Sequence, residues 1–205
     1  MTYGMAFVPQ FTITARLLAL SEGIAALRER IQNAAVELSW VPALQKDSRS
    51  RNVHASTAIE GNPLTLEQVR AIEEGRTLTA SDERSYREVL NYFAGLRHVE
   101  KNAAKKTLRH EDVFSLHRIL ADSVMDQGDA GRYRTIAVRV GNYFPPAAAD
   151  VSGLMMELLD WWNKPSKELS PVLSSAILHH RFESIHPLAD GNGRTGRALA
   201  LWELY

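Results

Sequence analysis

The sequence predicts an all-α protein with one small β-hairpin. Two observations support this prediction: apolar residues recur at helical spacing along most of the 205 residues, and a single short segment alternates instead. Capping residues, glycines and prolines separate the helical segments from one another. The length fits one domain, or one domain with a small appendage.

Eight helices are expected, and helix start and stop signals set their boundaries. Pro42 ends the first helix, and Gly61 suits the left-handed position after the second. Thr65 and Gln68 form a capping box, and Asp82 places a carboxylate at the positive end of a long helix. The expected spans are 17–38, 44–59, 65–75, 81–99, 110–124, 150–161, 170–185 and a last helix from about 194.

Two of these helices carry a clear apolar stripe, and the stripe predicts the face that turns to the core. The stripe residues are Val89, Phe93, Leu96 and Val99 in the fourth helix and Val113, Leu116, Leu120 and Val124 in the fifth.

One segment departs from the helical pattern. Residues 135–140 alternate and are rich in β-branched side chains, and the following Gly141-Asn142 pair is a turn signal. Pro145 and Pro146 keep the second arm from the centre of a sheet, because proline lacks the backbone donor. The sequence therefore predicts a small β-hairpin over 135–146.

Composition and charge describe an ordinary globular chain. Lys and Arg number 24 and Asp and Glu number 24, so the formal net charge is zero. This balance excludes a strongly basic nucleic-acid-binding coat and an acidic disordered tail. The lack of cysteine excludes disulfides and thiolate catalysis and fits a reducing compartment. Neither an export signal nor an apolar run of roughly 20 residues is present, so we expect a soluble, cytoplasmic protein without membrane contact.

A glycine-rich run over 186–197 carries the chemistry: His-Pro-Leu-Ala-Asp-Gly-Asn-Gly-Arg-Thr-Gly-Arg. Its glycines match the dinucleotide-binding spacing G-x-G-x-x-G, which is weak evidence alone. That fold needs a preceding strand and an acid about twenty residues later. The preceding segment is helical and the chain ends nine residues after Gly196, so we exclude that fold. A P-loop is also excluded, since no Gly-Lys-Ser/Thr follows.

The same run suits a bound anion. Glycines that lead into a helix let backbone N–H groups converge on an anion, and the helix N-terminus favours negative charge. Arg194 and Arg197 share one helix face and can both reach phosphate oxygens. Asp190 can hold a Mg²⁺ that bridges phosphates, and His186 is placed as a general base. These parts predict group transfer from a nucleotide.

The run resembles the active-site motif of the Fic family, His-x-Phe-x-Asp/Glu-Gly-Asn-Gly-Arg-x-x-Arg, and departs from it only at Leu188. The resemblance implies a Fic-type helical bundle that transfers AMP from ATP, with Mg²⁺ as cofactor, to a protein Ser, Thr or Tyr hydroxyl. It assigns His186 as the catalytic base and Asp190 as the Mg²⁺ ligand. The nucleotide-binding residues that it implies are Asp190, Gly191, Asn192, Gly193, Arg194, Thr195, Gly196 and Arg197.

A second match lies upstream, over residues 56–62. Ser56-Thr-Ala-Ile-Glu60-Gly-Asn resembles the family's inhibitory motif, and Ser56 and Glu60 lie on one helix face. The resemblance implies that Glu60 pairs with Arg197 and blocks the productive position of the γ-phosphate. A carboxylate on a phosphate-binding arginine satisfies its charge and repels the anion. We therefore expect autoinhibition by Glu60.

The predicted hairpin resembles the flap of the family. This resemblance implies that a hydroxyl-bearing target protein docks on the flap by strand addition. Val140, Gly141 and Asn142 are then expected near the nucleotide. The resemblance divides the chain into N-terminal helices over 1–80 and a Fic catalytic core over 81–205. Because that core usually continues for further helices, we expect it to be truncated at residue 205.

Several alternatives stay open at this stage. A Fic-fold enzyme could transfer another phosphate-containing group or remove AMP, and a nucleotide-sensing interaction module would not catalyse at all. A zinc site built from His179, His180, His186 and Asp190 is disfavoured, since the usual H-E-x-x-H spacing is absent. A homodimer is compatible with the resemblance, no nucleic acid is expected on this fragment, and the sequence does not identify the target protein.

Overall fold

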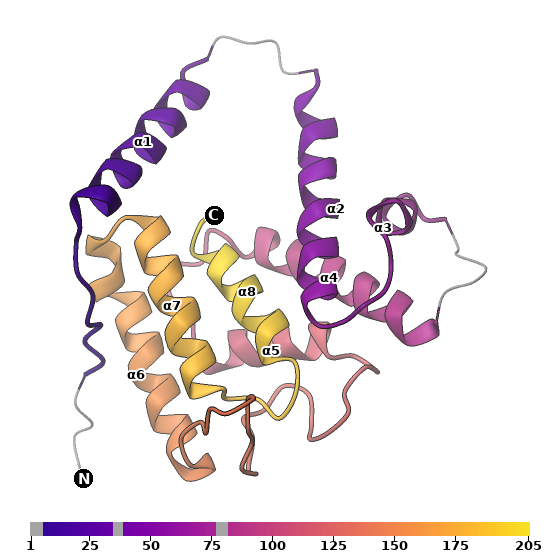
Figure 1. Ribbon diagram of the computed structural model, residues 1–205, viewed down its shortest axis with the longest axis vertical. Helices are drawn as coiled ribbons and strands as arrows, with labels where there is room; N and C mark the ends of the chain where they lie inside the picture. The colour runs from indigo at the N-terminus through magenta and orange to yellow at the C-terminus, as the bar shows by residue number, and fades with distance from the viewer. Residues whose placement is uncertain (1–5, 35–38, 77–81) are drawn as a thin grey trace.

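The computed structural model describes residues 6–34, 39–76 and 82–205. Within these ranges the chain is helical and forms no β-strand (Figure 1). The elements are α1 Ala15–Gln32, α2 Val41–Ile59, α3 Leu66–Glu73, α4 Glu83–Lys101, α5 His110–Leu120, η1 Ala148–Asp150, α6 Val151–Asn163, η2 Pro165–Glu168, α7 Pro171–Ile185 and α8 Asn192–Trp202, where η marks a 3₁₀ helix.

The helix α8 lies among four others, since it packs against α2, α4, α5 and α7. The apolar stripes predicted for α4 and α5 are buried, which confirms them. Gly95 of α4 lies where an added Cβ would collide with Leu120 of α5, so glycine permits this close approach. Because α8 carries the glycine-rich run, this packing places the candidate site within the bundle.

Capping signals locate several helix ends correctly. The capping box of Thr65 and Gln68 is formed, and Asp82 caps α4 by accepting from the backbone N–H of Ser85. Gly61 and Gly75 both have positive φ, as positions after a helix C-terminus require. These signals act within a single turn, so the sequence near each helix end is sufficient to predict them.

Three predicted helix features are wrong. The first helix ends at Gln32 and not near Leu38, which lies outside the described residues. Pro42 does not end that helix: it sits in the first turn of α2, where the N–H that proline lacks would have no helical partner. Helix α5 ends at Leu120, before Ser123 takes a left-handed φ of 58°. The expected boundary between the two parts of the chain, at 80/81, lies outside the described residues and stays a prediction.

The apolar residues that recur along α1 do not pack into the core. No residue of α1 is buried, and Ile24, Leu27 and Ile31 are exposed. Helical periodicity shows that one face is apolar but does not show which surface covers that face.

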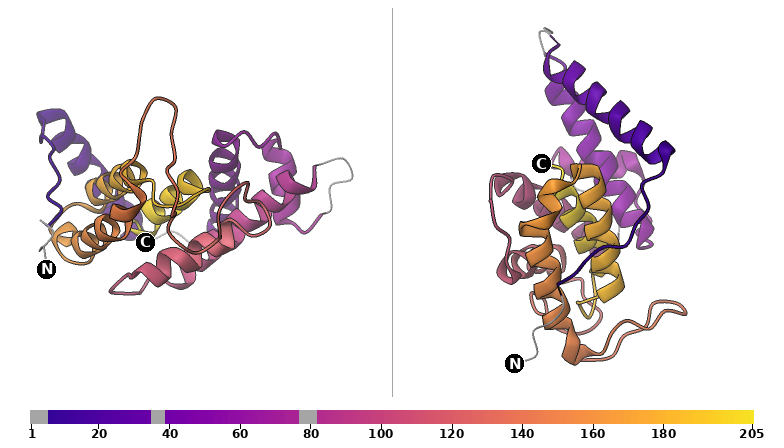
Figure 2. Two further views of the ribbon diagram at one scale, coloured as in Figure 1. Left: turned by 90° about the horizontal axis from the view of Figure 1, so that it is seen from below. Right: turned by 90° about the vertical axis from the view of Figure 1, so that its left-hand side faces the viewer.

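The predicted β-hairpin over 135–146 is also wrong as a pair of strands. The described residues show one isolated antiparallel bridge, in which the backbones of Val140 and Tyr143 exchange hydrogen bonds of 3.0 and 2.8 Å. The turn at Gly141 is present, with a φ of 56°. The segment extends away from the helices (Figure 2), so no neighbouring strand supports it, and Pro145 and Pro146 cannot donate to a ladder.

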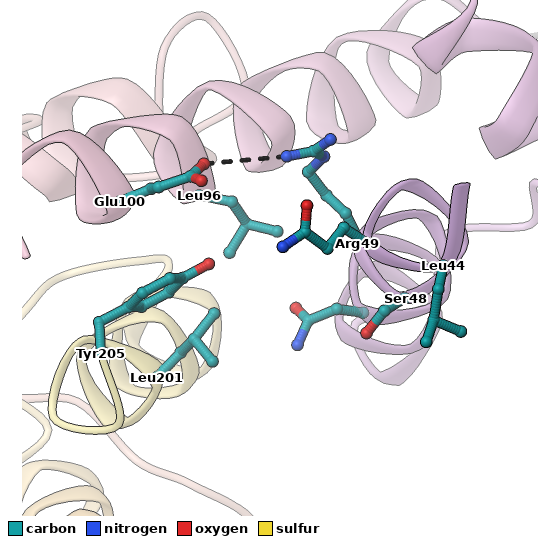
Figure 3. Close-up of a pocket in the computed structure, with 9 residues that line it drawn as sticks. Leu44, Ser48, Arg49, Leu96, Glu100, Leu201 and Tyr205 are labelled. Carbon is teal, nitrogen blue, oxygen red and sulfur yellow. Dashed lines mark ion pairs between the residues drawn. The ribbon is translucent and has the colours of Figure 1, made fainter. Parts of the chain in front are cut away.

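Among the described residues, no helix combines the length and the apolar character that a bilayer crossing requires. A cavity of about 350 Å³ lies between α2, α4 and the end of α8 (Figure 3). Leu96 and Leu201 contribute to its wall, and Arg49 and Glu100 form an ion pair of 3.8 Å beside it. None of its lining residues belongs to 186–197, so it is separate from the glycine-rich run.

Candidate active site

The loop between α7 and α8 is shaped by two left-handed residues. His186 ends α7 with a φ of 49° and a ψ of 60°, and Gly191 precedes α8 with a φ of 74°. Asn192 closes the loop, because its side chain both donates to the backbone oxygen of Leu188 and accepts from its N–H, each at 2.8 Å. Leu188 itself is fully buried, as expected for a core position. The side-chain amide of Asn192 therefore fixes the loop.

Arg194 is a buried cation without a hydrogen bond at two of its nitrogens. Its side chain is 6% exposed, and neither Nε nor Nη1 has a hydrogen-bond partner. The nearest carboxylates are Glu88, 3.8 Å from Nη1, and Asp190, 3.7 Å from Nη2. A buried guanidinium with unsatisfied donors is costly unless a ligand completes it. This observation fits a bound phosphate.

The carboxylate of Asp190 is held on both sides. Oδ2 accepts from the backbone N–H of Asp126 at 2.9 Å, and Oδ1 accepts from the backbone N–H of Gly191 at 2.6 Å. Among the described residues, no group of three or more His, Asp or Glu side chains lies close enough together to hold a metal ion. A single carboxylate together with substrate phosphates is the usual way in which proteins hold Mg²⁺, so Asp190 fits that ion.

Arg197 is bound by the upstream helix α2. Its Nε donates to Oγ of Ser56 at 2.7 Å, and its Nη2 donates to the backbone oxygen of Ser56 at 2.9 Å and to Oε1 of Glu60 at 2.7 Å. The expected contact between Glu60 and Arg197 is therefore present. The two arginines of the run thus differ. The guanidinium of Arg197 is hydrogen-bonded to Ser56 and Glu60, whereas two nitrogens of Arg194 have no hydrogen-bond partner.

The carboxylate of Glu60 lies over the first turn of α8. A Cβ added at Gly193 would collide with Oε1 of Glu60, so the carboxylate touches the helix there. The N-terminus of a helix favours negative charge. Glu60 therefore occupies both features that were predicted to hold phosphate, the helix N-terminus and one of the two arginines.

The catalytic candidate His186 lies beside a second carboxylate. Its Nδ1 is 3.6 Å from Oε2 of Glu183, and its side chain is 19% exposed. Glu183 also touches Gly196, since a Cβ there would collide with Oε1 of Glu183 and lie 3.1 Å from Phe182. Gly196 therefore lets α7 and α8 approach closely beneath the site.

The flap segment, defined here as residues 131–146, is tied to the loop by Arg134. This residue is buried, and its guanidinium donates to the backbone oxygens of His186 at 2.8 Å and Pro146 at 2.6 Å. Tyr143 adds a hydrogen bond of 2.8 Å to the backbone oxygen of Ser184. The flap segment is therefore anchored next to the catalytic candidate at two points, Arg134 near its start and Tyr143 beside its turn.

The tip of the flap segment is not joined to the glycine-rich run by a polar contact among the described residues. Among the described residues, no hydrogen bond or ion pair joins Val140, Gly141 or Asn142 to residues 186–197. Their polar contacts stay local: Arg139 donates to the backbone oxygen of Gly141 at 2.5 Å and to Asn142 at 3.2 Å. Their expected place near the nucleotide stays a prediction.

Two residues near the site were not expected from the sequence. Glu88 of α4 accepts from the side chain of Asn62 at 2.9 Å and faces Arg194, so it links the segment after α2 to the site. His117 of α5 is fully buried and contacts the backbone oxygen of Asp190 at 3.1 Å. Burial lowers the pKa of His117 to about 4. No short-range pattern could have found either residue, because their partners are remote in sequence.

Comparisons of the sequence with known proteins point to one family. Residues 107–204 match the model of the Fic/DOC family. The chain is 34% identical over 160 residues to Protein adenylyltransferase Fic of Drosophila willistoni, a match covering 76% of this chain and 32% of that protein. It is 35% identical to Protein adenylyltransferase fic-1 of Caenorhabditis elegans, over 72% of this chain and 30% of that protein. The chain thus spans about a third of the length of these relatives.

Solved structures show the same fold. A Fic family protein from Desulfovibrio desulfuricans G20 has a TM-score of 0.84 and 34% identity, over 97% of this chain and 60% of that one. Fic-1 from C. elegans has a TM-score of 0.78 and 27% identity, over 93% of this chain and 59% of that one. On the family match, the relatives and the shared fold, the chain belongs to the Fic/DOC family.

Proposed function

We propose that the chain is the adenylyltransferase part of a protein that transfers AMP from Mg-ATP to a protein hydroxyl. The observation that carries this proposal is the buried Arg194, which has two nitrogens without hydrogen bonds and lies in α8 next to Asp190. A triphosphate bound beside this guanidinium would offset its buried positive charge. The names of the adenylyltransferase relatives support the choice of AMP as the transferred group.

In the proposed reaction His186 acts as the general base. Nδ1 is the ring nitrogen near Glu183, so we assign Nε2 to take the proton from the target hydroxyl. The hydroxyl oxygen then bonds to the α-phosphorus, the bond from that phosphorus to the oxygen bridging the β-phosphate breaks, and pyrophosphate leaves. Arg194 and the backbone N–H groups at the start of α8 stabilise the phosphate charge. A Mg²⁺ held at Asp190 would offset further negative charge on the phosphate oxygens.

We further propose that Glu60 inhibits this reaction. Its carboxylate lies over the first turn of α8 and accepts from Arg197, where a phosphate of ATP would bind. Negative charge at this place repels the triphosphate. Removing the carboxylate should therefore both free Arg197 and remove the repulsion.

The protein target is proposed to dock on the flap segment. Phe144 is 71% exposed there, and Ile136, Val140 and Tyr143 are exposed as well. Apolar side chains gathered on an extended segment suit contact with another polypeptide. The anchoring of this segment to the backbone oxygen of His186 through Arg134 would place a docked hydroxyl near the base.

Intact mass spectrometry after incubation with Mg-ATP tests the proposal. The samples are wild type, Glu60→Gly, Glu60→Gly/His186→Ala and Glu74→Gly, each with a mixture of candidate target proteins. Glu74 is the matched control because it caps α3 as Glu60 caps α2, and its carboxylate pairs with Lys46 and Arg76 on the surface. An AMP adduct in Glu60→Gly alone is expected.

Two other outcomes would contradict parts of the proposal. Equal labelling by wild type and Glu60→Gly would refute the inhibitory role of Glu60. Binding of Mg-ATP to Glu60→Gly without an adduct would favour a nucleotide-sensing module. A parallel series with UTP and CTP separates AMP transfer from transfer of other groups.

A further inference from the structure

The side chain of His117 joins two backbone segments that are distant in sequence. Nδ1 lies 3.0 Å from the backbone nitrogen of Gly131, at the start of the flap segment. Nε2 lies 3.1 Å from the backbone oxygen of Asp190, in the loop before α8. The imidazole is fully buried between them. Its two bonds therefore hold both segments at a fixed separation.

The chemistry of the two partners determines where the ring proton lies. A backbone N–H such as that of Gly131 only donates, so Nδ1 must be an unprotonated acceptor. A backbone oxygen such as that of Asp190 only accepts, so Nε2 must carry the proton. Both bonds form only in the neutral ring with the proton on Nε2. Either other protonation state would leave one buried partner unsatisfied.

Further contacts concentrate around the same loop. The backbone N–H of Asp126 donates to Oδ2 of Asp190, and the side chain of Gln127 donates to the backbone oxygen of Ala189 at 3.0 Å. A Cβ added at Gly191 would lie 3.5 Å from Nε2 of His117, so the ring also packs against the start of α8. Through this buried ring, α5 touches the proposed phosphate-binding loop.

We propose that His117 is a positioning residue that couples the flap segment to the phosphate-binding loop. The bond from Nε2 holds the backbone of Asp190, and with it the N–H groups that face the phosphates. The bond to Nδ1 holds the start of the flap segment. This proposal rests on the proposed function only in one measurement, that of nucleotide binding.

Two substitutions separate the two bonds. His117→Asn keeps a polar group near the position of Nδ1, and His117→Gln keeps one near the position of Nε2. Both are made in the Glu60→Gly background, together with His180→Gln as a control, since His180 is exposed on α7. Mg-ATP affinity is measured by calorimetry, and protection of the Gly131 amide is measured by hydrogen exchange.

We expect opposite effects from the two variants. His117→Asn should weaken Mg-ATP binding about tenfold and keep the Gly131 amide protected. His117→Gln should keep the affinity within about threefold and lose that protection. Equal behaviour of the two variants, or no change in either, would overturn the proposal.

A spectroscopic measurement on the unmutated chain needs neither a variant nor activity. Long-range ¹⁵N–¹H NMR of the histidine rings reports which nitrogen carries the proton. His117 is expected as the neutral ring protonated at Nε2, and a proton on Nδ1 at neutral pH would refute the assignment. If Mg-ATP failed to bind to Glu60→Gly while this signature and the Gly131 exchange pattern held, the proposed function would fail and the coupling would stand.

Discussion

Nη2 of Arg197 donates to Oε1 of Glu60 at 2.7 Å, across 137 residues of sequence. Ser56 completes the contact by accepting from Nε and Nη2 of the same guanidinium. The side chains of Arg197 and Glu60 are 20% and 37% exposed, so the pair lies at the edge of the site rather than within the core. A pair in such a position is weak enough for a strongly binding anion to replace.

The hydroxyl of Ser56 should contribute a measurable part of this contact. Ser56→Ala removes the acceptor for Nε of Arg197 but leaves the bonds to the Ser56 backbone and to Glu60. We expect Mg-ATP affinity, measured by calorimetry, to rise about threefold, and less than in Glu60→Gly. Ser56→Thr keeps a hydroxyl and should match wild type. Affinity in Ser56→Ala equal to wild type would show that Oγ does not hold Arg197.

Arg194 should matter for the ligand more than for the fold. Its guanidinium is buried with two unbonded nitrogens, so replacement by Met should change the free energy of unfolding by less than about 1 kcal/mol. The same Arg194→Met change should weaken Mg-ATP binding about a hundredfold or more. Arg87→Met, at an exposed i,i+4 pair with Glu83, serves as the control and should leave binding unchanged. A large loss of stability with unchanged affinity would contradict this prediction.

Stability should fall in acid because of His117. Burial lowers the pKa of His117 to about 4 from the ordinary 6.5, so between these values the unfolded chain binds a proton that the folded chain excludes. The contribution of the neutral His117 to the free energy of unfolding is therefore fully present above about pH 6.5. It is lost as the pH falls toward 4, and the loss is about 3 kcal/mol at most. Urea unfolding across this range measures it. His117→Gln should lose this decline and His180→Gln should keep it; the same decline in both would exclude His117 as the cause.

Two helical glycines should respond to alanine in opposite directions. A Cβ at Gly196 would collide with Glu183 and crowd Phe182, so Gly196→Ala should destabilise the fold by about 1–3 kcal/mol. Gly153 of α6 has open space around it, so Gly153→Ala should stabilise the fold by up to about 1 kcal/mol. Thermal or urea unfolding of both variants measures this difference. Destabilisation by both, or by neither, would show that the α7–α8 contact is not the constraint at Gly196.

Local signals account for the parts of the fold that were predicted correctly. The Thr65 capping box and the Asp82 cap each depend on residues three positions apart, so the pattern is visible in the sequence. The hairpin was wrong because strand pairing needs a supporting neighbour, and at Val140 the chain forms only an isolated bridge. For α1, the period predicted a helix correctly, but burial depends on elements far away.

For the site, motif spacing was sufficient to identify the run 186–197 and the upstream motif that contains Glu60. The contact between Glu60 and Arg197 followed from a family resemblance, and the structure contains it. The roles of Glu88 and His117 could not be predicted, since neither belongs to a motif and their contacts cross between helices.

The sequence by itself determined that this chain is helical and where most of its helices begin, and it singled out the run that we propose to bind an anion. These features depend on caps, periods and spacings within a few residues. The tertiary structure alone decided which groups meet. It left two nitrogens of Arg194 without hydrogen bonds, placed Glu60 over Gly193, and set His117 between Gly131 and Asp190. These relationships arise from the packing of α2, α5 and α8, and packing brings together residues whose distance along the chain carries no pattern.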